Sequence, residues 1–133
     1  MAAGEVEKSE KITINLGPVD LGQIDLLVAE GFYANRTDFI RSAIRAQLAT
    51  RAAAVDQTAA RRTLTLGTLT LTRHELEELQ RGGRTVEIRV LGLATIASDV
   101  SPELALATIT AVEVLGAFRA PKTVKAALAN RTT

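Results

Sequence analysis

The chain has 133 residues, of which 47% are apolar and only 3% aromatic, and its formal net charge is +1. This length allows one ordinary domain or two very small ones, which disfavours a large catalytic architecture. The scarcity of aromatic side chains disfavours a stacking platform for single-stranded nucleic acid, and the near-neutral charge means that any nucleic-acid binding must depend on positioned side chains.

Cysteine is absent from the sequence, so the chain has no disulfide, no thiolate metal site and no cysteine nucleophile. An intracellular protein is the simplest interpretation of that composition. The sequence does not contain a basic segment followed by an apolar core, which is the pattern of a secretory signal. It also contains no apolar run long enough to span a membrane. We therefore expect a cytoplasmic protein that does not associate with a membrane.

The first regular element that the sequence predicts is a strand over Lys11–Leu16. Residues 1–9 are small or charged and show no periodicity, so we expect them to form a disordered tail. From residue 11 onward polar and apolar residues alternate, which is the pattern of a strand with one apolar face, and Gly17-Pro18 ends it. The apolar residues of the strand are Ile12, Ile14 and Leu16.

Two helices are predicted next. After Asp20, apolar residues recur at helical spacing, and Gly31 supplies a C-terminal stop. Asn35 is a suitable N-cap for a second helix that begins near Arg36 and carries Asp38 in its first turn. The apolar positions are Leu21, Ile24, Leu27 and Val28 in the first helix, and Phe39, Ile40, Ala43, Ile44 and Leu48 in the second.

An alanine-rich run follows the second helix. Residues 50–62 contain no glycine or proline, so the sequence predicts that the helix continues toward Arg61 and forms a helical connector. The N-terminal domain would then span residues 10–49 and the C-terminal domain residues 63–133.

The N-terminal domain is predicted to need a second copy. One strand and two helices of this length cannot bury both apolar faces, and a single strand leaves its hydrogen-bonding edge open. Pairing the strand with its copy around a two-fold axis gives an antiparallel ribbon above four helices. Such a ribbon fits the major groove of double-stranded DNA. The predicted dimer core contains Ile12, Ile14, Leu16, Phe39, Ile40 and Ile44.

The order of these elements resembles a known family. The segment "KITINL", a first helix and then "GFYANRTDFIRSAIRAQL" are similar to the ribbon-helix-helix DNA-binding proteins of the CopG, MetJ and Arc type, over about residues 10–50. The resemblance implies that Lys11, Thr13 and Asn15, on the outer face of the ribbon, contact base edges, and their side chains carry suitable donors and acceptors. A polar strand face taken alone is more often simply solvated.

The start of the second helix is the other DNA contact that the resemblance implies. Asn35, Arg36 and Thr37 would hold a DNA phosphate through free N–H groups and the helix dipole. An N-cap at Asn35 is expected with or without DNA. Arg41 and Arg45 are expected on a solvated face, or in ion pairs within the dimer, and not on bases.

The C-terminal domain contains an internal repeat with an offset of 24 residues. The matched pairs are Ile88 and Val112, Val90 and Val114, Leu91-Gly92 and Leu115-Gly116, Val100 and Val124, and Leu104 and Leu128. Each unit is predicted to contain a strand, a bend at glycine and a helix, with Pro102 or Pro121 near the helix start. The segment around Gly67 fits as a degraded first unit, with a capped helix that follows Thr72 and ends at Gly82-Gly83.

Repeat units of this length stack into a short solenoid with parallel strands on one side and helices on the other. The expected fold class is therefore α+β, with a ribbon-helix-helix dimer unit followed by a small, solenoid-like strand-helix repeat domain. The alternative is a small open α/β domain in which the repeat is coincidental.

No catalytic or cofactor signature is found in the C-terminal domain. His74 is the only histidine of the chain, and it lacks the partners that a zinc site or a nucleophilic triad needs. The family includes nickel-sensing regulators, but these depend on several histidines and a cysteine, so metal sensing is not expected. We expect no enzymatic activity, no cofactor and no bound metal.

Three hypotheses about function follow. The first is a sequence-specific double-stranded DNA-binding protein, a transcriptional regulator whose C-terminal domain builds oligomers larger than the dimer. The second is a scaffold or filament-forming protein that uses the N-terminal unit only to dimerise. The near-neutral charge of residues 1–61, with seven basic and eight acidic residues, favours this hypothesis over DNA binding. The third is an antitoxin whose C-terminal tail folds on a toxin. That role suits a disordered C-terminal tail better than the regularly patterned C-terminal half of this chain.

Overall fold

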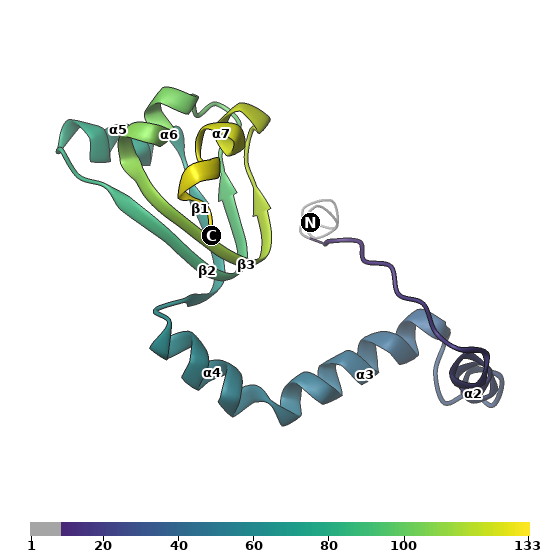
Figure 1. The fold of residues 1–133 in the computed structure, drawn as a ribbon. Helices are drawn as coiled ribbons and strands as arrows, with labels where there is room; N and C mark the ends of the chain where they lie inside the picture. Colours follow the sequence, from purple (N-terminus) through teal and green to yellow (C-terminus); the bar gives the residue numbers. More distant parts are fainter. Residues whose placement is uncertain (1–8) are drawn as a thin grey trace. The chain divides into compact units, whose positions relative to one another are not determined.

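The computed structural model describes residues 9–133 (Figure 1), so the tail predicted over residues 1–9 lies outside the described residues except for Ser9. The described chain divides into two compact units, Ser9–Gln57 and Thr58–Thr133. The boundary between them falls inside the segment that the sequence predicts as a connector. Within the described chain, no helix is both long enough and apolar enough to cross a membrane.

The N-terminal unit contains an extended segment and then two helices. α2 (Pro18–Ala29) has a proline at its start. Proline lacks a backbone N–H, but at this position the N–H would have no acceptor within the helix anyway. α3 (Arg36–Thr50) starts after Asn35, whose side-chain oxygen accepts a hydrogen bond from the N–H of Asp38 at 2.8 Å. Both predicted helices are confirmed. The first helix was predicted to start after Asp20, but α2 starts at Pro18 and includes Asp20.

The strand predicted over Lys11–Leu16 is not formed within a single chain. Residues 9–17 have no regular secondary structure, and the sheet of the described residues contains only strands that follow residue 64. A strand requires a hydrogen-bonded neighbour, and the neighbour predicted here is the same segment of a second copy. The apolar side chains of Ile12 and Ile14 are accordingly 74% and 53% exposed.

The long helix predicted to continue toward Arg61 is interrupted. α3 ends at Thr50, and α4 (Ala52–Arg61) begins after Arg51, whose φ and ψ are −111° and 9°. The hydroxyl of Thr50 donates a hydrogen bond to the carbonyl oxygen of Gln47 at 2.7 Å. Such a side-chain bond competes with the backbone for helix carbonyls and bends helices. The absence of glycine and proline predicted the helical content correctly but not the break.

The C-terminal unit is built on a three-stranded parallel sheet with strand order β1-β2-β3. Its strands are β1 (Thr65–Leu71), β2 (Val86–Ile96) and β3 (Ile109–Arg119). Ile88 lies opposite Val112 and Gly92 opposite Gly116, as the 24-residue offset predicts. Gly67 lies opposite Gly92, so the segment around Gly67 is in register with the two better-matched units.

Short helices cover one face of this sheet (Figure 1). They are α5 (Arg73–Arg81), α6 (Pro102–Thr108) and α7 (Lys122–Ala127), followed by the short 3-10 helix η1 (Ala129–Arg131). The side-chain oxygen of Thr72 accepts a hydrogen bond from the N–H of Glu75, which confirms the predicted cap of α5. The core between sheet and helices includes Leu76, Ile88, Ile109, Val112, Val124 and Leu128, all at most 1% exposed.

Three glycines form a column across the sheet. Gly67, Gly92 and Gly116 have φ values of 131°, 141° and 120°, a region that favours glycine. A Cβ atom on Gly92 would lie 2.1 Å from the carbonyl oxygen of Gly67, and one on Gly116 would lie 2.1 Å from that of Gly92. All three strands therefore share this strained conformation at the same level, and at Gly92 and Gly116 a side chain would collide with the neighbouring strand. The mixture of helices and parallel strands confirms the α+β class, whereas the solenoid description stays a prediction.

Candidate nucleic-acid interface

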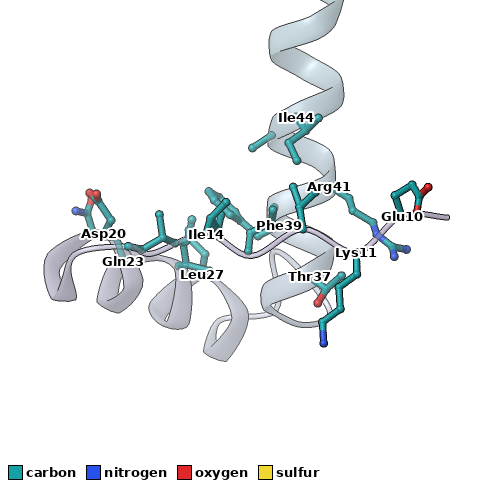
Figure 2. Close-up of a pocket in the computed structure, with 15 residues that line it drawn as sticks. Glu10, Lys11, Ile14, Asp20, Gln23, Leu27, Thr37, Phe39, Arg41 and Ile44 are labelled. Carbon is teal, nitrogen blue, oxygen red and sulfur yellow. The ribbon is translucent and has the colours of Figure 1, made fainter. Parts of the chain in front are cut away.

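The extended segment, α2 and α3 enclose a groove of about 930 Å³ (Figure 2). All six residues of the predicted dimer core, from Ile12 to Ile44, line it. Figure 2 shows Ile14, Leu27, Phe39 and Ile44 gathered around the groove from the three segments. The sequence therefore identified the apolar face of the N-terminal unit, although in a single chain that face borders an open groove and not a closed core.

Burial in the N-terminal unit is unusually low. Ile24 is the only fully buried residue between residues 9 and 57, and α3 has none. A folded unit of this size needs a larger apolar core to offset the loss of chain entropy. The open groove therefore leaves most apolar side chains of this unit in contact with solvent.

The residues predicted to contact bases lie before α2. Lys11, Thr13 and Asn15 are all exposed. Lys11 lines the rim of the groove together with Thr37 from the start of α3, and Figure 2 shows both side chains at the same end. The structure thus brings together one residue of the predicted base-contacting set and one of the predicted phosphate-binding set. Thr13 and Asn15 do not line the groove.

The first N–H groups of α3 have no hydrogen-bond acceptor within the helix. The side-chain oxygen of Asn35 is already used by the N–H of Asp38, and Oδ2 of Asp38 accepts a hydrogen bond from the N–H of Ala34 at 2.9 Å. The N–H groups of Arg36 and Thr37 have no intrahelical acceptor, because they belong to the first turn. An anion at this position would therefore be held by backbone N–H groups, since the Asn35 side chain is occupied.

Arg36 has a partner that the sequence analysis missed. Its Nε donates to Oδ1 of Asp25 at 2.7 Å and its Nη2 donates to Oδ2 at 2.8 Å. These hydrogen bonds lower the pKa of Asp25; desolvation opposes the shift, and the attraction between the charges adds to it. The same pair raises the pKa of Arg36. No periodic pattern within either helix predicts this pair, because it joins two different helices.

The remaining polar candidates lie at the surface. Arg41 lines the groove and is exposed, and Arg45 is exposed as well. His74 in α5 lies 3.6 Å from a carboxylate oxygen of Glu78, on an exposed side of the helix. In residues 9–133, no cluster of three or more histidine or acidic side chains is arranged to hold a metal ion.

The comparison with protein families extends beyond the N-terminal unit. A family model described as the ribbon-helix-helix transcriptional regulator family matches residues 7–125. Neither the curated proteins nor the solved structures give a match to the chain. Residues 64–133, for which the sequence analysis assigned no family, are thus largely inside the family match. The chain belongs to the ribbon-helix-helix transcriptional regulator family.

Proposed function

We propose that the protein is a sequence-specific double-stranded DNA-binding regulator of transcription that acts as a homodimer. In this proposal the N-terminal unit forms the dimer and contacts the major groove. The C-terminal unit joins dimers into larger assemblies. Family membership supports the role in regulation, and the contacts below support the mode of binding.

The observation that carries the dimer is the open groove of the N-terminal unit. The six apolar side chains of the predicted dimer core line it and are all exposed or half-buried, while Ile24 alone is buried among residues 9–57. A second copy would cover the groove with its own apolar face. Its segment Lys11–Leu16 would also supply the strand partner that this extended segment lacks within one chain.

Contacts with DNA follow from that arrangement. In the paired ribbon, Lys11, Thr13 and Asn15 alternate with the core residues and point away from the helices, toward the base edges of the major groove. The first turn of α3 would bind a phosphate through the N–H groups of Arg36 and Thr37, next to the cap residue Asn35. The ribbon would thus read the base sequence, and the start of α3 would position the protein on the DNA backbone.

Substitutions on the two faces of the extended segment test the dimer. Ile14→Asp places a charge in the predicted dimer core, so the protein should become monomeric and lose helical circular dichroism in the N-terminal unit. Thr13→Asp is the matched control, because the same charge on the adjacent residue lies on the outer face. It should stay dimeric by light scattering but lose DNA binding. A dimeric and fully helical Ile14→Asp protein would refute the proposed interface.

DNA binding is tested on duplexes selected from a random pool. Asn15→Ala should cost about 1–3 kcal/mol on the selected duplex and little on random DNA, because a base contact is lost. Replacing Thr37 by Pro removes a backbone N–H from the first helical turn, where proline is tolerated. That change should weaken binding to both duplexes alike. Equal losses on both duplexes for Asn15→Ala would contradict base reading by the ribbon.

The scaffold or filament protein is the second candidate function. β1 contains no charged residue and lies at the edge of the sheet, where charges usually prevent association. The selection experiment separates the two functions, since a scaffold would enrich no sequence and bind no duplex while still assembling. The antitoxin hypothesis has less support, because residues 58–133 form a packed unit and not a tail.

A further inference from the structure

Both edges of the three-stranded sheet are open at the same level. Among residues 9–133, no strand pairs with the outer edge of β1. β3 is covered only near its beginning, where Val112 forms an isolated parallel bridge with Thr132 and its carbonyl oxygen accepts a hydrogen bond from the N–H of Thr133 at 2.9 Å. From Val114 to Phe118, no strand of the described chain pairs with the edge of β3 that faces away from β2.

The glycine column makes the two edges complementary. The position of a Cβ on each later glycine is taken by the carbonyl oxygen of the glycine before it, from Gly67 to Gly92 and from Gly92 to Gly116. On β1, the space where a Cβ of Gly67 would lie has no neighbour within 4 Å, although its φ of 131° matches those of the other two. On β3, the carbonyl of Gly116 is the next one in the series. Gly67 of another chain is a residue that fits there.

The start of β1 also fits the open part of the β3 edge. β1 begins at Thr65, which lies opposite Val90 of β2. The same register on β3 starts at Val114, because Val90 lies opposite Val114. A β1 strand added to β3 would therefore leave the level of Val112 free, which is where Thr132 already lies. The C-terminal residues and an incoming β1 strand occupy different parts of the β3 edge.

The chemistry of the edges favours association. Leu66, Leu91 and Leu115 form a row across the sheet, and Leu66 and Leu115 at its ends are 65% and 41% exposed. Helix charges are complementary as well. Lys122 and Lys125 lie on α7, which follows β3, and α7 carries no acidic residue. α5, which follows β1, carries three glutamates against two arginines, and its exposed Glu75 is free of the ion pair that Glu78 forms with Arg81.

We propose that β1 of one chain pairs in parallel with β3 of a second copy, with Gly67 opposite Gly116. The sheet then continues from chain to chain, and α5 of one copy, with its exposed Glu75, lies next to the basic α7 of the other. This inference rests on the assembly role in the proposed function and names its surface and its register. The contact uses two different edges, so it produces a ring or an open filament and not a closed pair.

The inference can be tested by disulfide formation in the full chain, which has no natural cysteine. Leu66→Cys and Leu115→Cys are combined in one chain. Neighbouring strands lie about 4.8 Å apart, which suits a disulfide between two copies. Within one chain β2 separates the two positions, so their spacing of roughly twice that distance prevents an internal bond. Mild oxidation should produce a ladder of covalent multimers on a non-reducing gel.

Three controls use the same oxidation. Each single cysteine variant should give no multimers, and a mixture of the two should give only a covalent pair of different chains. Thr70→Cys combined with Leu115→Cys is the off-register control, because residue 70 lies about 13 Å further along β1. It should give no ladder. Covalent pairs from Leu66→Cys alone would overturn the inference, since they would mean that two β1 edges meet.

Light scattering of the unoxidised protein separates the failure of this inference from that of the assembly role. An assembly larger than a dimer without cross-linking of the Leu66→Cys/Leu115→Cys chain would overturn the edge pairing and leave the assembly role standing. A plain dimer at every protein concentration would overturn both. Binding to selected duplex DNA would be unaffected in either case.

Discussion

Arg36 at the start of α3 donates two hydrogen bonds to the carboxylate of Asp25 on α2, at 2.7 and 2.8 Å. The pair joins the two helices of the N-terminal unit next to the proposed phosphate site. It also places a negative charge beside the first turn of α3. A DNA phosphate that binds there must compete with Asp25 for the guanidinium of Arg36.

Asp25→Asn should strengthen binding to duplex DNA of any sequence, because it frees the charge of Arg36 for phosphate. The plot of log affinity against log salt should become steeper by about 0.9 per protomer if each freed arginine adds one phosphate contact. Glu30→Gln is the matched control, since it removes one negative charge from the end of α2 without touching Arg36. An equal gain in both variants would mean that net charge, and not the Arg36 pair, limits binding.

The same pair predicts a pH dependence of stability. Hydrogen bonds from Arg36 hold the pKa of Asp25 in the folded chain below its ordinary value of 3.8. The pair therefore contributes stability above the unfolded pKa, and this contribution is lost as the pH falls through the folded pKa. The difference in stability between the wild type and Asp25→Asn should shrink on acidification from about pH 5 to pH 2. In Arg36→Ala, an NMR titration should find a higher pKa for Asp25, and an unchanged pKa would rule out the stated cause.

The glycine column predicts a large loss of stability for Gly92→Ala. The new Cβ would meet the carbonyl oxygen of Gly67 at 2.1 Å, and φ is 141°. Backbone strain and overpacking together should cost roughly 2–5 kcal/mol in denaturant unfolding of the C-terminal unit. Gly83→Ala is the control for strain alone, since its φ is 66° and nothing lies within 4 Å. It should cost about 1–2 kcal/mol. Equal costs would show that the close approach at Gly92 relaxes freely.

A stabilising substitution is predicted at Thr63. This residue has a φ of 58° after the end of α4, where the N–H of Leu64 donates to the carbonyl oxygen of Ala59 at 2.8 Å. Glycine is preferred in that conformation, and a β-branched residue is strained there. Thr63→Gly should raise the free energy of unfolding by about 1 kcal/mol. Thr65→Gly, in the extended backbone of β1, should lower it, and a loss at both positions would argue against strain at Thr63.

The sequence by itself determined the elements that depend on neighbouring residues. Asn35 with Asp38, and Thr72 with Glu75, predicted two helix starts, because an N-cap bond spans only three residues. The alignment of Gly92 with Gly116 predicted their pairing, because equal repeat units bring equivalent positions into register.

Only the tertiary structure decided the contacts that join separate elements. The Arg36–Asp25 pair depends on how α2 packs against α3, and neither helix alone carries a signal for it. The open edge of β3 was equally hidden, because it depends on where Thr132 returns to the sheet. Helix caps and repeat registers are set by short-range or repeated interactions that a sequence displays directly. Contacts between elements depend on their relative placement, which is the sum of many weak packing interactions along the whole chain.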